Sequence, residues 1–541
     1  MGAFEATMIR AFLSAILQLG LIFGFVGSVV GTALAQQAAN STVNSQNTTE
    51  LLKAIDQLLE QNRQLEQQTQ KLQTENQQLI DQIRTIRKGL AEGTKQDTAA
   101  PPAAASGDLK SPETPNTSPN VSTPTAAAGN EPAGAPQAVQ EERTIWGRYT
   151  PNLGFKVADT KHGDLSVSIY TYARYLNQRA LDNTFTDSFG NVKPVQQRQD
   201  LQLTKVQIKF LGWIMSPKFR YFLYGWTNNA AQGLPAQVVL AGNLNYQFNK
   251  LFTFSGGITA LPGVRSTEGN FPFWLGVDAR HIADEFFRPS YTSGIWARGD
   301  ITNHLRYQTM VGNNLSTLGV SAAQLDNKFN TFAGALVWTS TPTDQFGAGF
   351  GDFENHEKLA ARLGAHFTRS NETKESQPNS ESFENTQLRL SDGNIIFTPN
   401  LFGPGVVINE ARYRMSSFDG ALKYHGMALE GEYYMRWLDN FQGPNVSVVP
   451  NLFDHGFQLQ SSAMVVPKTL QLYLGTSKIF GQYGDPYDAR FGANWFVFKN
   501  RVVRWNSEAL YLYRSPVGYT AVPFTVGGTG WVFHTTVEMA F

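Results

Sequence analysis

In short runs of the last two thirds of the chain, apolar residues stand at every second position, and charged side chains occur among the residues between them. In an extended strand, residues at this spacing share one face, so the charges would face one side and the apolar residues the other. Charges fixed around an aqueous lumen do not catalyse a reaction, but together they create an electrostatic field that acts on ions. The charged positions on this face are Lys205, Lys209, Arg220, Arg306, Arg362, Lys423, Arg436, Arg490, Arg504, Asp419, Glu430, Glu432, Glu508 and Glu538.

A second group of charges lies in residues 261–290, which read LPGVRSTEGNFPFWLGVDARHIADEFFRPS and show little alternation. The several aromatic residues of this segment favour packing against a wall, although an ordinary surface loop would also fit the pattern. Its charged residues are Arg265, Glu268, Asp278, Arg280, His281, Asp284, Glu285 and Arg288.

Signs of catalysis are weak. The eight histidines show no H-E-x-x-H spacing, and no G-x-S-x-G nucleophile motif occurs. His425 and His534 have no evident serine partner. The absence of cysteine excludes disulfides and thiolate metal sites. We therefore expect no enzyme, no metal site and no cofactor, and the formal net charge of zero gives no reason to expect nucleic acid as a partner.

The elements that carry these charges are predicted to be strands, because short alternating runs recur between turn signals. The predicted strands are 165–175, 202–214, 219–226, 238–248, 251–259, 291–298, 304–312, 331–340, 357–369, 410–424, 427–438, 456–465, 469–478, 487–498, 502–513 and 529–541. Short and long joins are expected to alternate between them. An even number of strands with alternating joins is typical of an outer-membrane barrel. The sequence thus predicts an all-β fold, a 16-stranded antiparallel transmembrane β-barrel over residues 146–541, and strand 529–541, ending on Phe541, should close it against the first.

The N-terminal part of the sequence predicts a signal peptide followed by three further regions. Residues 1–35 have the form of a signal peptide that ends in A-x-A, with Met8 as an alternative start. After a polar lead over 36–50, leucines or isoleucines recur every seven residues over 51–90, which predicts an α-helical coiled coil about 60 Å long. A single docked amphipathic helix is the alternative. Residues 91–143 are rich in Pro, Ala, Ser and Thr and are predicted to be a disordered linker.

From about residue 200 to the end, the chain resembles the phosphate-selective porin O and P family. The resemblance includes LTKVQIKFLGWIMSPKFRYFLYGW and SGIWARGDITNHLRYQTMVGNN, and it lies in the strand pattern. It implies a trimeric, sixteen-stranded, anion-preferring channel, some members of the family carrying an N-terminal coiled coil. It also implies that residues 261–290 form a constriction loop and that Phe541 is the C-terminal assembly signal.

These inferences lead us to expect a channel in the bacterial outer membrane with its coiled coil in the periplasm. Its partners would be membrane lipid, two further copies of the chain, and small hydrophilic solutes, with a mild preference for anions. The heptads alone lean towards a dimer, but we favour the trimer. The alternatives are a structural anchor whose coiled coil reaches the cell wall, and a barrel hydrolase.

Overall fold

The computed structural model describes residues 149–150, 153–228, 237–268, 271–318, 320, 329–343, 345–347, 349–378, 387–519 and 521–541. The predicted signal peptide, polar lead, coiled coil and linker all lie outside the described residues. Within those residues no helix is both long enough and apolar enough to cross a membrane.

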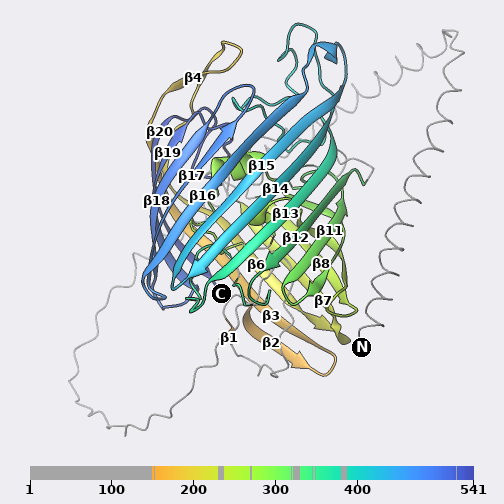
Figure 1. The fold of residues 1–541 in the computed structure, drawn as a ribbon, viewed down its shortest axis with the longest axis vertical. Coiled ribbons are helices and arrows are strands. Elements are labelled where there is room, and N and C mark those ends of the chain that lie inside the picture. Colours follow the sequence, from red (N-terminus) through yellow and green to blue (C-terminus); the bar gives the residue numbers. More distant parts are fainter. Residues whose placement is uncertain are drawn as a thin grey trace, which may run out of the picture. The chain divides into compact units, whose positions relative to one another are not determined.

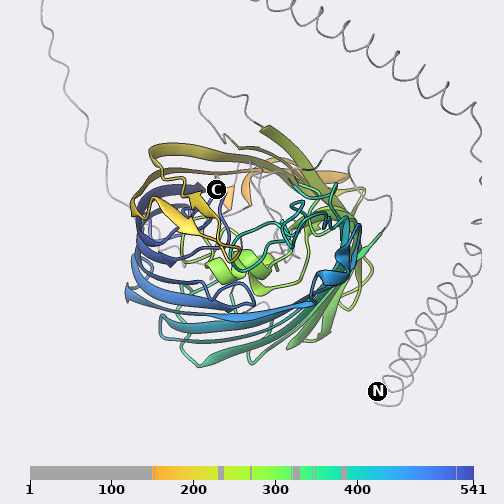
Figure 2. The same cartoon turned by 90° about the horizontal axis from the view of Figure 1, so that it is seen from above.

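Most of the described chain forms one antiparallel sheet that closes on itself as a 16-stranded barrel (Figures 1 and 2). All sixteen predicted strands are present, with ends shifted by a few residues, which confirms the predicted fold class. In order around the ring they are β3 (Gly163–Leu181), β6 (Gln199–Ile214), β7 (Ser216–Asn228), β8 (Gln237–Gln247), β9 (Thr253–Ala260), β10 (Tyr291–Thr302), β11 (Leu305–Gly312), β12 (Thr331–Thr339), β13 (Ala360–Thr373), β14 (Glu410–Tyr424), β15 (Met427–Gln442), β16 (Leu452–Val466), β17 (Leu470–Phe480), β18 (Tyr487–Phe496), β19 (Val503–Tyr513) and β20 (Gly530–Ala540).

A few short elements lie outside the ring. β2 (Gly154–Thr160) pairs with the start of β3, and β1 (Tyr149–Thr150) pairs with β2. β4 (Thr184–Thr186) and β5 (Val192–Pro194) form a small hairpin in the first long loop. The sequence reasoning missed these four strands. The described helices are η1 (Arg265–Thr267), α3 (Ile282–Phe287) and η3 (Val446–Val448).

The ring closes where β20 pairs with β3, as the alternation at the end of the chain predicts. The terminal Phe541 continues this ladder, because its amide donates to the Ile169 carbonyl at 2.9 Å and its carbonyl accepts from the Ile169 amide at 2.7 Å. No edge is left between the first and last strands, so the backbone groups of both are satisfied within the sheet.

The two ends of the barrel differ in the length of their joins. One end, here called the short-turn end, carries tight turns such as 425–426 and 303–304. The other, the long-loop end, carries long segments such as 261–290 and 374–409. The predicted strict alternation is wrong at one place: the join 340–359, between β12 and β13, is long although it leaves from the short-turn end.

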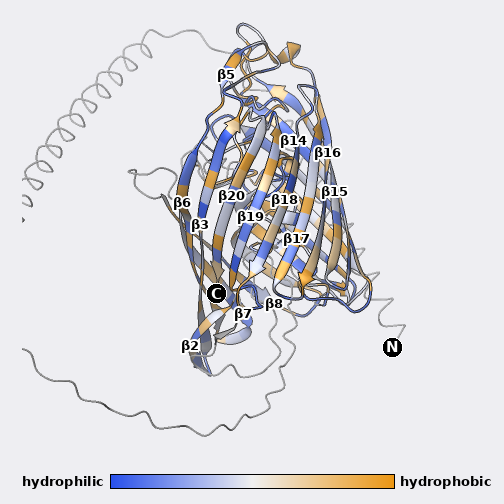
Figure 3. Ribbon diagram, turned by 90° about the vertical axis from the view of Figure 1, so that its left-hand side faces the viewer, coloured by the Kyte–Doolittle hydropathy of each residue, from blue (hydrophilic) through white to orange (hydrophobic). Residues whose placement is uncertain are grey.

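Hydrophobic and hydrophilic residues alternate along the strands of the barrel (Figure 3), and the hydrophobic ones include many large side chains that are exposed on the outer face. Side chains on the outward parity of neighbouring strands are exposed although they are large and hydrophobic, for example Leu459, Trp505 and Phe533, each nearly half exposed. A face of this kind is unfavourable in water and favourable in hydrocarbon, where the closed ladder also leaves no backbone group unpaired. The outer face therefore has the character of a lipid-facing surface.

This reading predicts a depth-dependent cost of a charge on the outer face. Leu459 lies at the middle of β16, so Leu459→Arg should destabilise the barrel in lipid by about 2–4 kcal/mol, whereas Phe453→Arg near the end of the same strand should cost about 0–1 kcal/mol. Urea unfolding of both variants in lipid bilayers measures the difference. Equal effects at the two positions would contradict a membrane around the middle of the barrel.

Candidate functional site

The interior of the barrel is polar, and every charged residue predicted for the inner face lies on the inward parity of its strand. On β13 and β14, for example, buried and exposed residues alternate, and Arg362, Asp419 and Lys423 are on the buried side. The same holds on the other strands for Lys205, Lys209, Arg220, Arg306, Arg436, Arg490, Arg504, Glu430, Glu432, Glu508 and Glu538. The alternation along each strand therefore puts these side chains on the inner face of the barrel.

The third loop lies between β9 and β10, and its described residues, 261–268 and 271–290, fold into the barrel instead of outwards. Figure 2 shows its helix α3 inside the ring of strands. Its charged side chains, including Arg265, Asp278, Arg280, Asp284, Glu285 and Arg288, are all less than a tenth exposed. A buried charge is stable only when it is paired or hydrogen-bonded, so the contacts of these groups determine what the interior can do.

One cluster joins the third loop to β11, β13 and β14. The Glu268 carboxylate forms ion pairs with the guanidinium of Arg362 at 2.6 Å and with the guanidinium of Arg306 at 3.3 Å. Arg362 also binds Asp419 at 2.7 Å, and Asp419 lies 2.9 Å from the His366 ring. Arg362 thus bridges one carboxylate of the loop and one of the wall.

Further contacts fix the loop near its start and in its middle. Arg265 binds Glu430 on β15 at 2.6 Å, and the Arg265 backbone amide donates to Glu432 at 3.1 Å. On the opposite side of the loop, Asp278 is 3.0 Å from the Lys205 amine and accepts a hydrogen bond from the Tyr172 hydroxyl at 2.9 Å.

Two wall arginines also hold the backbone of the loop. Arg490 donates to the Arg280 carbonyl at 2.7 Å and lies 3.5 Å from Glu508. Arg504 donates to the Trp274 carbonyl at 2.6 Å while it pairs with Glu538 at the same distance. Each guanidinium therefore satisfies a loop carbonyl and a wall carboxylate together, which its several N–H groups allow.

Other charged groups of the loop have partners within the loop itself. Glu285 accepts from Arg280 and from Arg288, each at 2.7 Å, and Asp284 accepts from the Ser266 hydroxyl at 2.8 Å. Opposed charges in this half of the barrel are therefore in direct contact. They hold the loop to the wall instead of facing each other across water.

The inner face of β6 to β11 is different, because basic side chains remain partly exposed there. Lys209, Arg220, Arg298 and Arg306 all lie on the inward parity towards the short-turn end, and each is neither fully buried nor fully exposed. Asp300 is an acidic residue of the same parity. This partial exposure distinguishes the inner face of β6 to β11 from the part of the interior that the third loop covers.

Sequence reasoning missed some inward charges. Arg174 on β3 is fully buried and donates to the Val277 carbonyl at 2.6 Å. Asp454 pairs with Arg436 at 2.6 Å, and Asp488 lies 2.8 Å from the His281 ring. Arg174 and Asp488 had the inward parity of predicted strands, so that signal was available. Asp454 lay just before the predicted start of its strand.

Among the described residues no cluster of His, Asp and Glu could hold a metal ion.

Comparison with known proteins places the barrel beside solved outer-membrane proteins at low similarity. No protein-family model and no curated protein matches the chain. An anion-selective porin from Comamonas acidovorans is 10% identical with a TM-score of 0.43, covering 70% of this chain and 100% of that one. The outer-membrane channel DcaP of Acinetobacter baumannii is 8% identical with a TM-score of 0.42, covering 71% and 99%. Likeness at this level carries no argument about function, which we take from the barrel's own residues.

The Arg362 cluster yields a stability prediction. Arg362→Met leaves the buried Glu268 and Asp419 carboxylates without their main partner, so the variant should lose about 3–5 kcal/mol of unfolding free energy. Arg369 lies on the exposed parity of the same strand, so Arg369→Met should change stability by no more than about 0.5 kcal/mol. Urea unfolding of both variants provides the measurement. A similar small effect at both positions would show that the cluster is not buried as described.

Proposed function

We propose that the protein is a porin of the bacterial outer membrane, a passive diffusion channel for small hydrophilic solutes with a mild preference for anions. One observation carries the proposal: the chain forms a closed 16-stranded barrel, apolar outside and polar inside, with a long loop folded into its interior. Barrels of about this size enclose an aqueous lumen, and a loop held inside narrows it.

The anion preference is inferred from the half of the interior that the third loop leaves partly exposed. In the other half of the interior, many basic side chains are buried and paired with carboxylates. The partly exposed Lys209, Arg220 and Arg298 then outnumber Asp300 on the inner parity of their strands. Since screening acts over about 8 Å at physiological salt, such residues affect ions that pass close to them. A loose group of this kind supports mild preference and not tight selection of one anion.

The finer parts of the proposal go beyond the barrel. We propose a homotrimer with lipid around it and the short-turn end in the periplasm, which the usual topology of such barrels favours. The coiled coil over 51–90 would then lie in the periplasm. Membership of the phosphate-selective porin O and P family also stays a prediction, which rests on the strand pattern.

Two other functions are less well supported. A structural anchor would share the barrel and the coiled coil, but it gives no reason for basic side chains on a partly exposed inner face. A barrel hydrolase needs a serine activated by a histidine base. His534, on the inner face of the last strand, instead lies 3.1 Å from the Glu508 carboxylate.

Liposome swelling tests the proposed function directly. Vesicles that contain the protein should swell in isotonic solutions of small neutral sugars, because the channel lets solute follow its gradient. Replacing 264–288 with a short Gly-Ser bridge should speed swelling and extend it to larger sugars, since the third loop occupies the interior. Vesicles that stay osmotically intact with the wild-type protein would overturn the proposal. Unchanged rates after loop removal would place the loop away from the path.

Charge reversal on the exposed inner face tests the anion preference. In a KCl gradient across a planar bilayer, the wild-type reversal potential should take the anion-selective sign and shrink as salt is raised. Lys209→Glu, Arg220→Glu and Arg298→Glu together should move it towards cations. Lys468→Glu with Lys499→Glu, on exposed residues of two short turns, is the control and should move it far less. A wild-type channel that prefers potassium would contradict the assignment.

A further inference from the structure

The join 340–359 between β12 and β13, described except for residues 344 and 348, is longer than the strands require. Thr339 pairs with Arg362, and the Ser340 amide donates to the Ala361 carbonyl at 2.8 Å. Strands in this register can be connected by a two-residue turn. The chain instead enters the barrel from the short-turn end, where Phe346, Phe350 and Asp352 are almost completely buried. We call this segment the inward join.

The inward join is anchored to the wall of the barrel by polar contacts. The Lys423 amine, which is fully buried, donates to the carbonyls of Phe346 at 3.3 Å and Gly349 at 3.2 Å and lies 4.6 Å from the centre of the Phe346 ring. Asp352 accepts from the Gly426 amide at 2.8 Å. These contacts satisfy a buried charge and two buried carbonyls, so they favour one position of the segment.

The inward join also touches the third loop, which enters from the opposite end. The Phe350 amide donates to the Phe273 carbonyl at 2.9 Å, and the Arg265 guanidinium lies 4.4 Å from the centre of the Phe350 ring. Glu430 connects the two segments, because one of its oxygens binds Arg265 and the other accepts from the Gly351 amide at 2.9 Å. One wall carboxylate therefore holds both segments.

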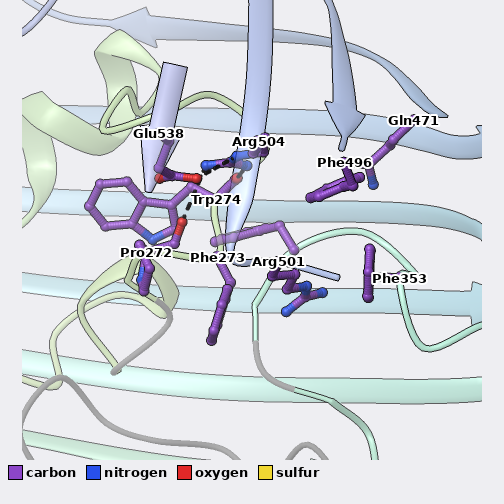
Figure 4. Close-up of a pocket in the computed structure, with 10 residues that line it drawn as sticks. Pro272, Phe273, Trp274, Phe353, Gln471, Phe496, Arg501, Arg504 and Glu538 are labelled. Atoms are coloured by element: carbon purple, nitrogen blue, oxygen red, sulfur yellow. Dashed lines mark hydrogen bonds and ion pairs between the residues drawn. The ribbon is translucent and has the colours of Figure 1, made fainter. Parts of the chain in front are cut away.

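Figure 4 shows side chains of the two segments and of the wall that line a pocket at this contact. The Arg501 guanidinium lies 4.6 Å from the ring centre of Phe273, on the third loop, and 4.8 Å from that of Phe353, on the inward join, and it pairs with Glu354 at 3.2 Å. The pocket between these side chains and Trp274 has a free volume of about 20 Å³, room for roughly one water molecule.

A hydrogen bond also stiffens the far part of the inward join. The His356 ring lies 2.5 Å from Asp352, and its other nitrogen is 3.0 Å from the Gln345 carbonyl. The hydrogen bond with Asp352 raises the pKa of His356 above its ordinary value. Both ends of the buried stretch are therefore tied together as well as to the wall.

We propose that the inward join forms the part of the constriction that lies towards the short-turn end. Together with the third loop it would confine solutes to the basic inner face of β6 to β11. The contacts of the two segments lie mainly against β13 to β20, so between them they fill that side. The inference rests on the proposed channel function and adds a second element to it. The specificity of the channel then depends on a segment that enters from the periplasmic side.

Shortening the join tests this inference in a planar bilayer. Residues 341–360 are replaced with Asn-Gly, so that Ser340 and Ala361 are linked by a tight turn. The single-channel conductance should rise above that of the wild type, and the anion preference should fall, because part of the path moves away from the basic face. The matched control is Glu357→Gln with Lys358→Gln, two exposed residues of the same segment, which should leave both quantities unchanged.

The outcomes separate the two proposals. A silent wild-type protein overturns the channel function and this inference together. A wild-type channel whose conductance and ion preference are unchanged in a folded, shortened variant overturns this inference alone. Folding of the variant is checked by its mobility on gels before and after heating.

A chemical measurement tests the buried position without relying on conduction, since the chain has no native cysteine. In the folded protein, Phe350→Cys should react with a water-soluble maleimide much more slowly than Glu357→Cys, and removal of 264–288 should speed the reaction at position 350. Both thiols should react fully after unfolding. Equal rates at the two positions in the folded protein would overturn the inward position of the join.

Discussion

The pairing of β20 with β3 is the interaction on which the rest of the structure depends. It removes the only two edges that an open sheet of these strands would have, so the backbone is satisfied without water. Closure also divides every strand into an outer and an inner side. The apolar parity can then face lipid, while charged residues gather in a shared interior that would not exist in an open sheet.

Within that interior, burial decides what the charges do. Near the third loop and the inward join, pairs such as Arg362 with Glu268 and Arg265 with Glu430 are almost fully enclosed. Such pairs add little net stability over apolar packing, but breaking one is costly, so they favour a single arrangement of the segments they join. Lys209 and Arg220 lie on the other side, where more water reaches them. Basic residues thus hold the inward segments to one wall, and in the proposed channel they would attract anions on the other.

The strands and their facing could be predicted because alternation is a local property of the chain. Leu429, Trp505 and Phe533 read as outward from their neighbours alone, and all are exposed. Pairing could not be predicted, because the partner of Lys205 is Asp278, far along the chain in a loop without regular pattern. The same reason hid the role of 340–359. The length of this segment was visible in the sequence. However, Lys423 is bound by backbone carbonyls and Glu430 by a backbone amide, and such contacts cannot be predicted from the identities of the side chains.

The central claim is that a water-filled path runs through this barrel beside the two inward segments. Single-channel recording of the full-length protein in a planar lipid bilayer tests it most directly. The account predicts discrete insertion steps, each followed by a steady current that is proportional to voltage over a moderate range. A folded protein that inserts into the bilayer and gives no current above the leak of the lipid would contradict it.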